Sequence, residues 1–227
     1  MKVIFVRHGE STGNAGVPSF DLSKLELTAA GHAQAAAVAA SWEHRPDLIV
    51  LSPYLRTHLT AQPTIKRYPG VPVEVVPMEE FTYLEPSRWN GTSRAERLPH
   101  IEAFWETADP AYCDGPGAES FDTLLQRVDL TLQRLESLPA NALVYAFSHG
   151  QFMQAVRVTL SHPTWTARQK MAHFWPFSAE FPVLNVDQVG VVYKAGVWRL
   201  LNVRADHPEL SSASAQCLSD LREVTRQ

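Results

Sequence analysis

Two short apolar runs in the sequence each lead directly into a histidine that is followed by glycine. Residues 2–6 precede the first, with His8 one position after an arginine, and residues 142–147 precede the second, His149. Runs of β-branched and aromatic residues of this length are typical of buried strands. Open α/β sheets bind ligands at the carboxyl ends of their strands, so we expect both histidines where such a sheet carries out its function.

Strand-like and helix-like segments alternate along the rest of the chain. The alanine-rich segment at 28–42 predicts a helix with Thr28 as its N-cap. Pro63 is expected to disturb the next helix. Pro72 indicates that its strand begins there or lies at a sheet edge. Predicted helices cover residues 28–42, 55–65, 120–138 and 151–160, further predicted strands cover 47–51 and 71–76, and a hairpin covers 186–193 and 197–203 with its turn near 195–196.

This alternation predicts an α/β fold, a three-layer sandwich in which helices flank a mostly parallel central sheet. The length of 227 residues fits one domain better than two, so residues 1–227 are predicted to form a single domain. Residues 77–117 lack clear periodicity and collect Pro, Trp and charged side chains, which indicates an inserted, partly helical lobe or lid over the site. The polar tail from Asp206 is expected to fray.

Charge and hydropathy exclude several classes of partner. The formal net charge is −4 and the pI is about 6.1, so the chain lacks the basic surface that binds nucleic acid or an anionic membrane. A small anionic substrate remains compatible, because a pocket can be locally positive. No apolar run approaches the roughly 20 residues that span a bilayer, and the first residues show no secretory-signal pattern, so the cytoplasm is the expected location.

The cysteines and histidines do not predict a metal site or a cofactor. Cys113 and Cys217 lie far apart and lack the spacing of a zinc site, so both are expected to be unpaired thiols. The histidines other than His8 and His149 show no HExxH-like spacing and are expected on the surface or in loops.

The segment around His8 is suited to phosphoryl transfer. That reaction needs cations around the equatorial oxygens, an in-line nucleophile and an acid for the leaving oxygen. Arg7 offers a guanidinium fork, the small residues after His8 let the backbone approach an anion, and Asn14 adds a donor. A neutral imidazole is a nucleophile that needs no metal and forms a phosphohistidine.

Five motifs occur in order along the chain. They are Val6-Arg7-His8-Gly9-Glu10-Ser11 with Asn14, Leu27-Thr28 with Gly31, Ser52-Pro53 with Arg56-Thr57, Gly117-Ala118-Glu119-Ser120, and Ser148-His149-Gly150. Together they resemble the histidine phosphatase superfamily, which includes the cofactor-dependent phosphoglycerate mutases and many small-molecule phosphatases. The resemblance runs from residue 3 to about 155, with a weaker match at 198–207.

The resemblance implies a role for each matching residue. His8 would accept the phosphoryl group, while Arg7, Arg56 and a protonated His149 would hold its oxygens and Asn14 would add a hydrogen bond. Taken alone, Arg56 also fits a surface ion pair, and His149 also fits a hydrogen-bonded histidine of the core.

Four carboxylates compete for the role of proton donor, namely Glu79, Glu80, Glu85 and Glu96. We choose Glu80, because a glutamate with an aromatic residue three places on resembles the family pattern, and Glu85 is the second choice. In this role the residue would protonate the leaving oxygen and then activate the water that hydrolyses phosphohistidine.

The sequence departs from the mutases just after Glu80. The mutase pattern continues with Arg-His-Tyr-Gly, whereas Phe81-Thr82-Tyr83-Leu84 stands here, and the long mutase insertion is missing. We therefore predict a metal-independent hydrolase that acts on a small phosphorylated metabolite through a phosphohistidine. The alternatives are a phosphoglycerate mutase-type phosphotransferase and a catalytically weak binding or regulatory member of the same fold.

The sequence does not identify the substrate or the oligomeric state. In the predicted lobe, Arg88, Arg94 and Arg97 stand near Trp89, a combination that suits a second anionic group, a ring, or simply a solvated face. The aromatic cluster at 174–177 fits either a substrate pocket or, preferably, core packing.

Overall fold

The computed structural model describes residues 1–16, 21–92 and 94–201 of the chain, without the side chain of Arg94. Cys217 and the tail from Asp206 lie outside this part, as does most of the weaker match at 198–207. The described residues form one six-stranded sheet with the order β3-β2-β4-β1-β5-β6. Its strands are β1 (Lys2–Arg7), β2 (Leu48–Leu51), β3 (Val73–Val75), β4 (Leu143–Ser148), β5 (Gln188–Lys194) and β6 (Val197–Leu200).

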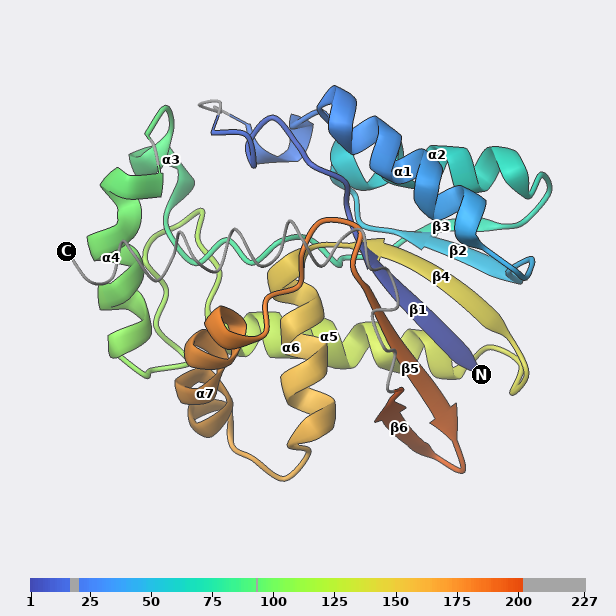
Figure 1. Ribbon diagram of the computed structural model, residues 1–227. Helices are drawn as coiled ribbons and strands as arrows, with labels where there is room; N and C mark the ends of the chain where they lie inside the picture. Colours follow the sequence, from blue (N-terminus) through green and yellow to red (C-terminus); the bar gives the residue numbers. More distant parts are fainter. Residues whose placement is uncertain (17–20, 93, 202–227) are drawn as a thin grey trace.

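The sheet is mostly parallel and lies between two helical layers, as predicted (Figure 1). β1 to β4 run parallel, and β5 and β6 are antiparallel additions at one edge. One face carries the helices α1 (Ala29–Ser41) and α2 (Leu55–Arg67), and the other carries α5 (Phe121–Glu136), α6 (Gly150–Ser161) and α7 (Ala167–Glu180).

Alternation along β1 explains why both faces are covered. Val3 and Phe5 belong to the larger apolar core, which also contains residues of α5, α6 and α7. Ile4 and Val6 belong to a second core with residues of α1 and α2. Successive side chains of a strand point to opposite faces, so a strand that is apolar throughout requires a layer on each side.

The strand order creates a crevice at the carboxyl ends of β1 and β4. The two strands are neighbours, and Arg7 is paired with Ser148 in their parallel register. After β1 the chain continues into α1 on one face, and after β4 it continues into α6 on the other. Such a point, where neighbouring connections leave on opposite faces, is where open α/β sheets bind ligands. His8 and His149 follow immediately in the sequence.

The first helix begins where the sequence predicted. Thr28 is the N-cap of α1 and accepts a hydrogen bond from the Gly31 amide. Gly31 lies against the backbone of Glu10, so closely that a Cβ at this position would overlap the Glu10 carbonyl oxygen. Glycine therefore lets α1 pack directly on the loop that follows His8.

Pro63 lies inside the second helix, which extends two residues beyond the predicted end at residue 65. α2 continues to Arg67, whose guanidinium donates from Nη1 to the carbonyls of Ala39 and Ala40 and from Nη2 to that of Trp42. These bonds attach the last turn of α2 to the end of α1, and they offset the backbone hydrogen bond that proline removes.

Residues 77–117 contain two helices, α3 (Pro86–Trp89) and α4 (Arg94–Glu106), which lie beyond the carboxyl ends of the parallel strands in Figure 1. Ile101, Phe104 and Trp105 of α4 contribute to the larger core. Trp105 stacks on Phe174 of α7, with ring centroids 5.1 Å apart. That this segment is a lid on a single domain remains a prediction, but the segment and α7 share one apolar core.

The carboxyl-terminal hairpin agrees with its prediction. β5 and β6 are joined at Ala195 and Gly196, which both have positive φ values, 53° and 76°. Two such residues in succession match the right-handed twist of the flanking strands.

None of the helices in the described ranges is long and apolar enough to cross a bilayer.

Candidate active site

His8 follows the carboxyl end of β1 and is only 2% exposed. Its Nδ1 lies 2.7 Å from the carbonyl oxygen of Gly9. Because a carbonyl only accepts hydrogen bonds, Nδ1 carries the proton and Nε2 keeps its lone pair. Nε of Arg56 donates to this Nε2 at 3.0 Å. The Nε2 lone pair of His8 therefore accepts a hydrogen bond from a cationic side chain.

The environment keeps the His8 ring neutral. Burial lowers the pKa of His8 well below its usual value, and the charges of Arg56 and Arg7 lower it further. A protonated ring would face two guanidinium groups in a site that excludes water. The neutral form is also the nucleophilic form of imidazole.

Backbone contacts fix the position of the His8 loop. The His8 amide donates to the carbonyl of Ser148 at the end of β4, at 3.0 Å, and Asn185 Nδ2 donates to the His8 carbonyl at 2.9 Å. The Gly9 amide donates to Thr60 Oγ1 of α2, also at 3.0 Å. Three separate elements thus hold the residue that would act as nucleophile.

Arg7 and Arg56 both reach the site from different elements. Arg7 donates from Nη1 to the carbonyl of Val183, while its buried Nε has no partner among the described residues. Arg56 is 5% exposed and donates from Nη1 to the carbonyl of Leu22. The surface ion pair considered for Arg56 is therefore wrong. Burial lowers the pKa of Arg56 to about 10, so it stays charged at neutral pH.

His149 is the N-cap residue of α6 and is fully buried. Its ring centroid lies 5.2 Å from that of His8, in an edge-to-face arrangement. Nε2 is 2.8 Å from Ser52 Oγ, whereas Nδ1 has no partner within the described part of the chain. Burial lowers the pKa of His149 well below its usual value, and the charges of Arg56 and Arg7 lower it further. These surroundings favour a neutral ring, and the protonated His149 that the resemblance implies stays a prediction.

Asn14 is oriented by hydrogen bonds to its side-chain oxygen. Oδ1 accepts from the amide of Ser11 (3.2 Å), from Ser11 Oγ (3.1 Å) and from Asn185 Nδ2 (3.2 Å). The amide nitrogen is therefore the end that faces away from these groups and can donate to an anion.

Glu80, and not Glu85, lies beside the arginines. Glu80 Oε1 accepts from the backbone amide of Gln151 in the first turn of α6, at 2.8 Å. Burial lowers the pKa of both Arg7 and Arg56, and the negative charge of Glu80 opposes that lowering at both guanidinium groups, which indicates that it is close to both.

The other carboxylates with described partners have structural contacts. Glu85 is the N-cap of α3, accepts from Ser87 and Gly117, and has its pKa lowered chiefly by the Gly117 amide. Glu79 pairs with Arg127 at 3.4 Å. The structure therefore favours Glu80 among the predicted candidates, although its role as proton donor is still a prediction.

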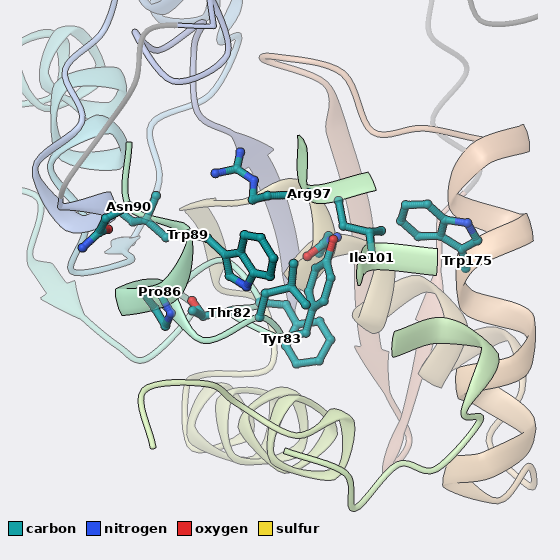
Figure 2. Close-up of a pocket in the computed structure, with 12 residues that line it drawn as sticks. Thr82, Tyr83, Pro86, Trp89, Asn90, Arg97, Ile101 and Trp175 are labelled. Atoms are coloured by element: carbon teal, nitrogen blue, oxygen red, sulfur yellow. The ribbon is translucent and has the colours of Figure 1, made fainter. Parts of the chain in front are cut away.

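A cavity of about 280 Å³ adjoins this cluster (Figure 2). Two of its lining residues also contact the site: the carbonyl of Leu22 accepts from Arg56, and the amide of Gln151 donates to Glu80. Much of the remaining wall comes from residues 81–101, the segment predicted to cover the site. The size is near the lower end for small-molecule pockets, which fits a small metabolite.

The aromatic cluster at 174–177 divides between the two roles considered for it. Phe174 is fully buried in the core, as preferred from the sequence, whereas Trp175 lines the cavity.

No group of three or more potential metal ligands occurs among the described residues.

Sequence reasoning missed Asn185 and Thr60. Neither side chain belongs to a recognisable motif next to the histidines, and Asn185 is 177 positions from His8. Thr60 lies one turn after Arg56 in α2, and its contact with Gly9 depends on how α2 packs on the sheet.

Comparison with known proteins gives a consistent result. The model of the histidine phosphatase superfamily (branch 1) matches residues 3–198. A mannitol-1-phosphatase of Eimeria tenella is 33% identical over 105 residues, which cover 41% of this chain and 33% of that protein. The aligned part thus spans about a third of the relative's length.

Solved structures share the fold at lower identity. A putative α-ribazole-5′-phosphate phosphatase of Escherichia coli has a TM-score of 0.69 at 21% identity, with 88% of this chain and 94% of that chain covered. A mycobacterial glucosyl-3-phosphoglycerate phosphatase has a TM-score of 0.68 at 23% identity (88% and 96% covered), and a phosphoserine phosphatase of Entamoeba histolytica has 0.69 at 22% (88% and 95% covered).

Proposed function

The chain belongs to the histidine phosphatase superfamily, and on that premise we propose that it is a metal-independent phosphomonoester hydrolase that acts on a small phosphorylated metabolite. The observation that carries the proposal is the buried, neutral His8, whose Nε2 lone pair meets the Arg56 guanidinium at 3.0 Å. This arrangement combines a nucleophile with a cation at the place where phosphoryl oxygens would lie.

In the first step, Nε2 of His8 attacks the phosphorus atom and the bond from phosphorus to the ester oxygen breaks. The leaving oxygen takes a proton from the acid form of Glu80, so the alcohol departs neutral. The ring becomes cationic as the phosphorus–nitrogen bond forms. Its Nδ1 proton remains hydrogen-bonded to the Gly9 carbonyl, which stabilises that positive charge.

In the second step, the Glu80 carboxylate takes a proton from water, and the resulting oxygen attacks phosphorus as the bond to His8 breaks. Inorganic phosphate leaves, and His8 and Glu80 return to their initial states. Both steps place extra negative charge on the phosphoryl oxygens, which Arg7 and Arg56 would stabilise in a region of low dielectric constant.

His149 can serve the phosphoryl group even without a net charge. If the Ser52 hydroxyl donates to Nε2, the proton of the neutral ring resides on Nδ1, the nitrogen without a described partner. That N–H, together with Nε of Arg7, forms a pair of buried donors whose ligand would be the phosphoryl oxygens.

The experiment is phosphate release from a panel of phosphomonoesters in the presence of a chelator. The parent protein is compared with His8→Ala and with His32→Ala, which removes an exposed histidine of α1 outside the site. We expect release by the parent and by His32→Ala but not by His8→Ala, with phosphate trapped on His8 in a sample that is denatured and analysed under alkaline conditions, where the phosphorus–nitrogen bond is stable. Loss of release on chelation, or equal release by His8→Ala, would contradict the proposal.

A further inference from the structure

The charges around the cavity are of one sign. Arg97 of α4 lines it, and none of the described lining residues is an aspartate or glutamate. The guanidinium of Arg97 donates from Nη1 to the carbonyl of Thr92 at 3.3 Å, and it forms no ion pair with a described residue. A half-buried cation therefore lies beside a substrate cavity with donors still available for a ligand.

Aromatic rings form much of the wall around that cation. Tyr83, Trp89 and Trp175 all line the cavity, and Figure 2 shows the Arg97 side chain above the rings of Trp89 and Tyr83, with its guanidinium turned away from Trp175. Such walls offer an apolar surface for a short carbon chain or a ring. A ligand that fills the space between them displaces water, which strengthens the interaction of Arg97 with a charge on that ligand.

The cavity meets the phosphoryl site through Leu22 and Gln151, which contact Arg56 and Glu80. A bound phosphomonoester would thus extend from His8 along the aromatic wall towards Arg97. We propose that the alcohol part of the substrate bears a carboxylate that Arg97 binds, so that the substrate class is the phosphate esters of small hydroxy acids. This inference rests on the proposed hydrolase function of the same site.

A neutral polyol or sugar fits this cavity less well. Its hydroxyl groups would leave the Arg97 charge without a counter-charge as the substrate displaces water. A carboxylate supplies that charge and matches the two-pronged geometry of the guanidinium. The polar side chains of Asn90 and Gln151 on the wall can then bond neighbouring hydroxyl or amino groups.

The test compares pairs of phosphate esters that differ only in charge. One series contains the phosphates of 4-hydroxybenzoic acid and of short-chain hydroxy acids, and the other contains their primary carboxamides. The value of kcat/KM is measured for each pair with the parent protein, with Arg97→Gln, and with Arg88→Gln. Arg88 is the matched control, since it belongs to the same segment but pairs with Asp114 and does not line the cavity.

We expect the parent and Arg88→Gln to prefer the carboxylate member by at least about tenfold, and Arg97→Gln to lose that preference while hydrolysing the carboxamides as the parent does. Hydrolysis of both series without a preference would overturn the inference and leave the hydrolase proposal standing. An equal loss on both series in Arg97→Gln would also overturn it, because Arg97 would then act on the shared phosphate. If no ester is hydrolysed by any form, the proposed function itself fails.

Discussion

Nε of Arg56 donates a hydrogen bond to Nε2 of His8 at 3.0 Å, although the two residues are 48 positions apart in the chain. The bond occupies the lone pair that would attack phosphorus, so a substrate must displace it before reaction. On displacement the same donor comes to face a phosphoryl oxygen. Arg56 would therefore orient the His8 ring before the substrate binds and stabilise the phosphoryl oxygens once it has bound.

Arg56→Lys should lower kcat steeply, because lysine keeps the charge but lacks both Nε and the planar fork. We expect a loss of roughly 100-fold or more, in line with the removal of one donor to a transition-state oxygen. Steady-state kinetics together with thermal unfolding will check this. The control is Arg134→Lys, which alters an exposed ion pair with Glu74 and should behave as the parent does. A parental kcat in Arg56→Lys would show that the guanidinium of Arg56 is not required for the reaction.

Glu80→Gln and Glu85→Gln should fail in different ways. Glu80→Gln should lower kcat for an alkyl phosphate roughly 100-fold or more, since the leaving oxygen loses its acid. With 4-nitrophenyl phosphate, whose leaving group needs no proton, the phosphoenzyme should still form and should accumulate because water is not activated. Rapid-quench measurement of the phosphoenzyme distinguishes these steps.

Glu85→Gln should keep the chemistry and weaken the fold around α3. The change weakens the acceptor that caps α3 and binds the Gly117 amide, so the temperature of thermal unfolding should fall while kcat stays near the parental value. The reverse pattern, with Glu85→Gln inactive and Glu80→Gln active, would transfer the proton-donor role to Glu85.

The stability of the empty protein should decrease below neutral pH. The pKa values of His8 and His149 are lowered on folding, so the unfolded chain binds more protons than the folded one once the pH falls below about 6.5. Their contribution is complete above that pH and is lost as the pH falls towards the folded-state values. Each histidine can contribute a slope of up to about 1.4 kcal/mol per pH unit to the free energy of unfolding.

Urea unfolding between pH 7.5 and 5 measures this slope. His149→Asn removes one of the two buried rings and should show a shallower dependence on pH than the parent, whereas His32→Ala, at an exposed position, should not change it. An unchanged slope in His149→Asn would mean that this ring is protonated in the empty site.

Gly31→Ala should disturb both the fold and the His8 loop. The added Cβ would overlap the carbonyl of Glu10, and backbone on both sides leaves no flexible group to move aside. We expect a loss of about 2 kcal/mol or more in the free energy of unfolding and a lower kcat. The control is Ala30→Ser, at an exposed neighbouring position of α1. If Gly31→Ala has the parental free energy of unfolding, α1 can move away from Glu10 without loss of stability, and the prediction is wrong.

The elements that position the histidines could be predicted from the sequence because they depend on local patterns. Residues 3–6 before His8 and residues 142–147 before His149 are apolar, and the parallel pairing of β1 with β4 then brings the two strand ends together. The N-cap at Thr28 and the hairpin turn at 195–196 also follow from local residue preferences.

The features that were missed depend on contacts between distant segments. α7 was not predicted, since Pro176 interrupts its pattern, yet Thr166 and Gln169 form a capping box and Phe174 packs on Trp105. Glu80 was chosen over Glu85 from its spacing to an aromatic residue, but the structural role of Glu85 could not be predicted, because Glu85 binds the amide of Gly117, 32 positions later.

The cavity wall and the phosphoryl site are largely built by different stretches of chain. Glu80 lies at their junction, where it contacts the first turn of α6, and the aromatic wall begins at the next residue with Phe81. We therefore expect an exchange of residues 81–101 between relatives to transfer substrate preference, while His8, Arg7, Arg56 and Glu80 keep their positions and proposed roles. The same boundary gives natural sequence drift a region in which new substrates can be acquired without loss of the reaction.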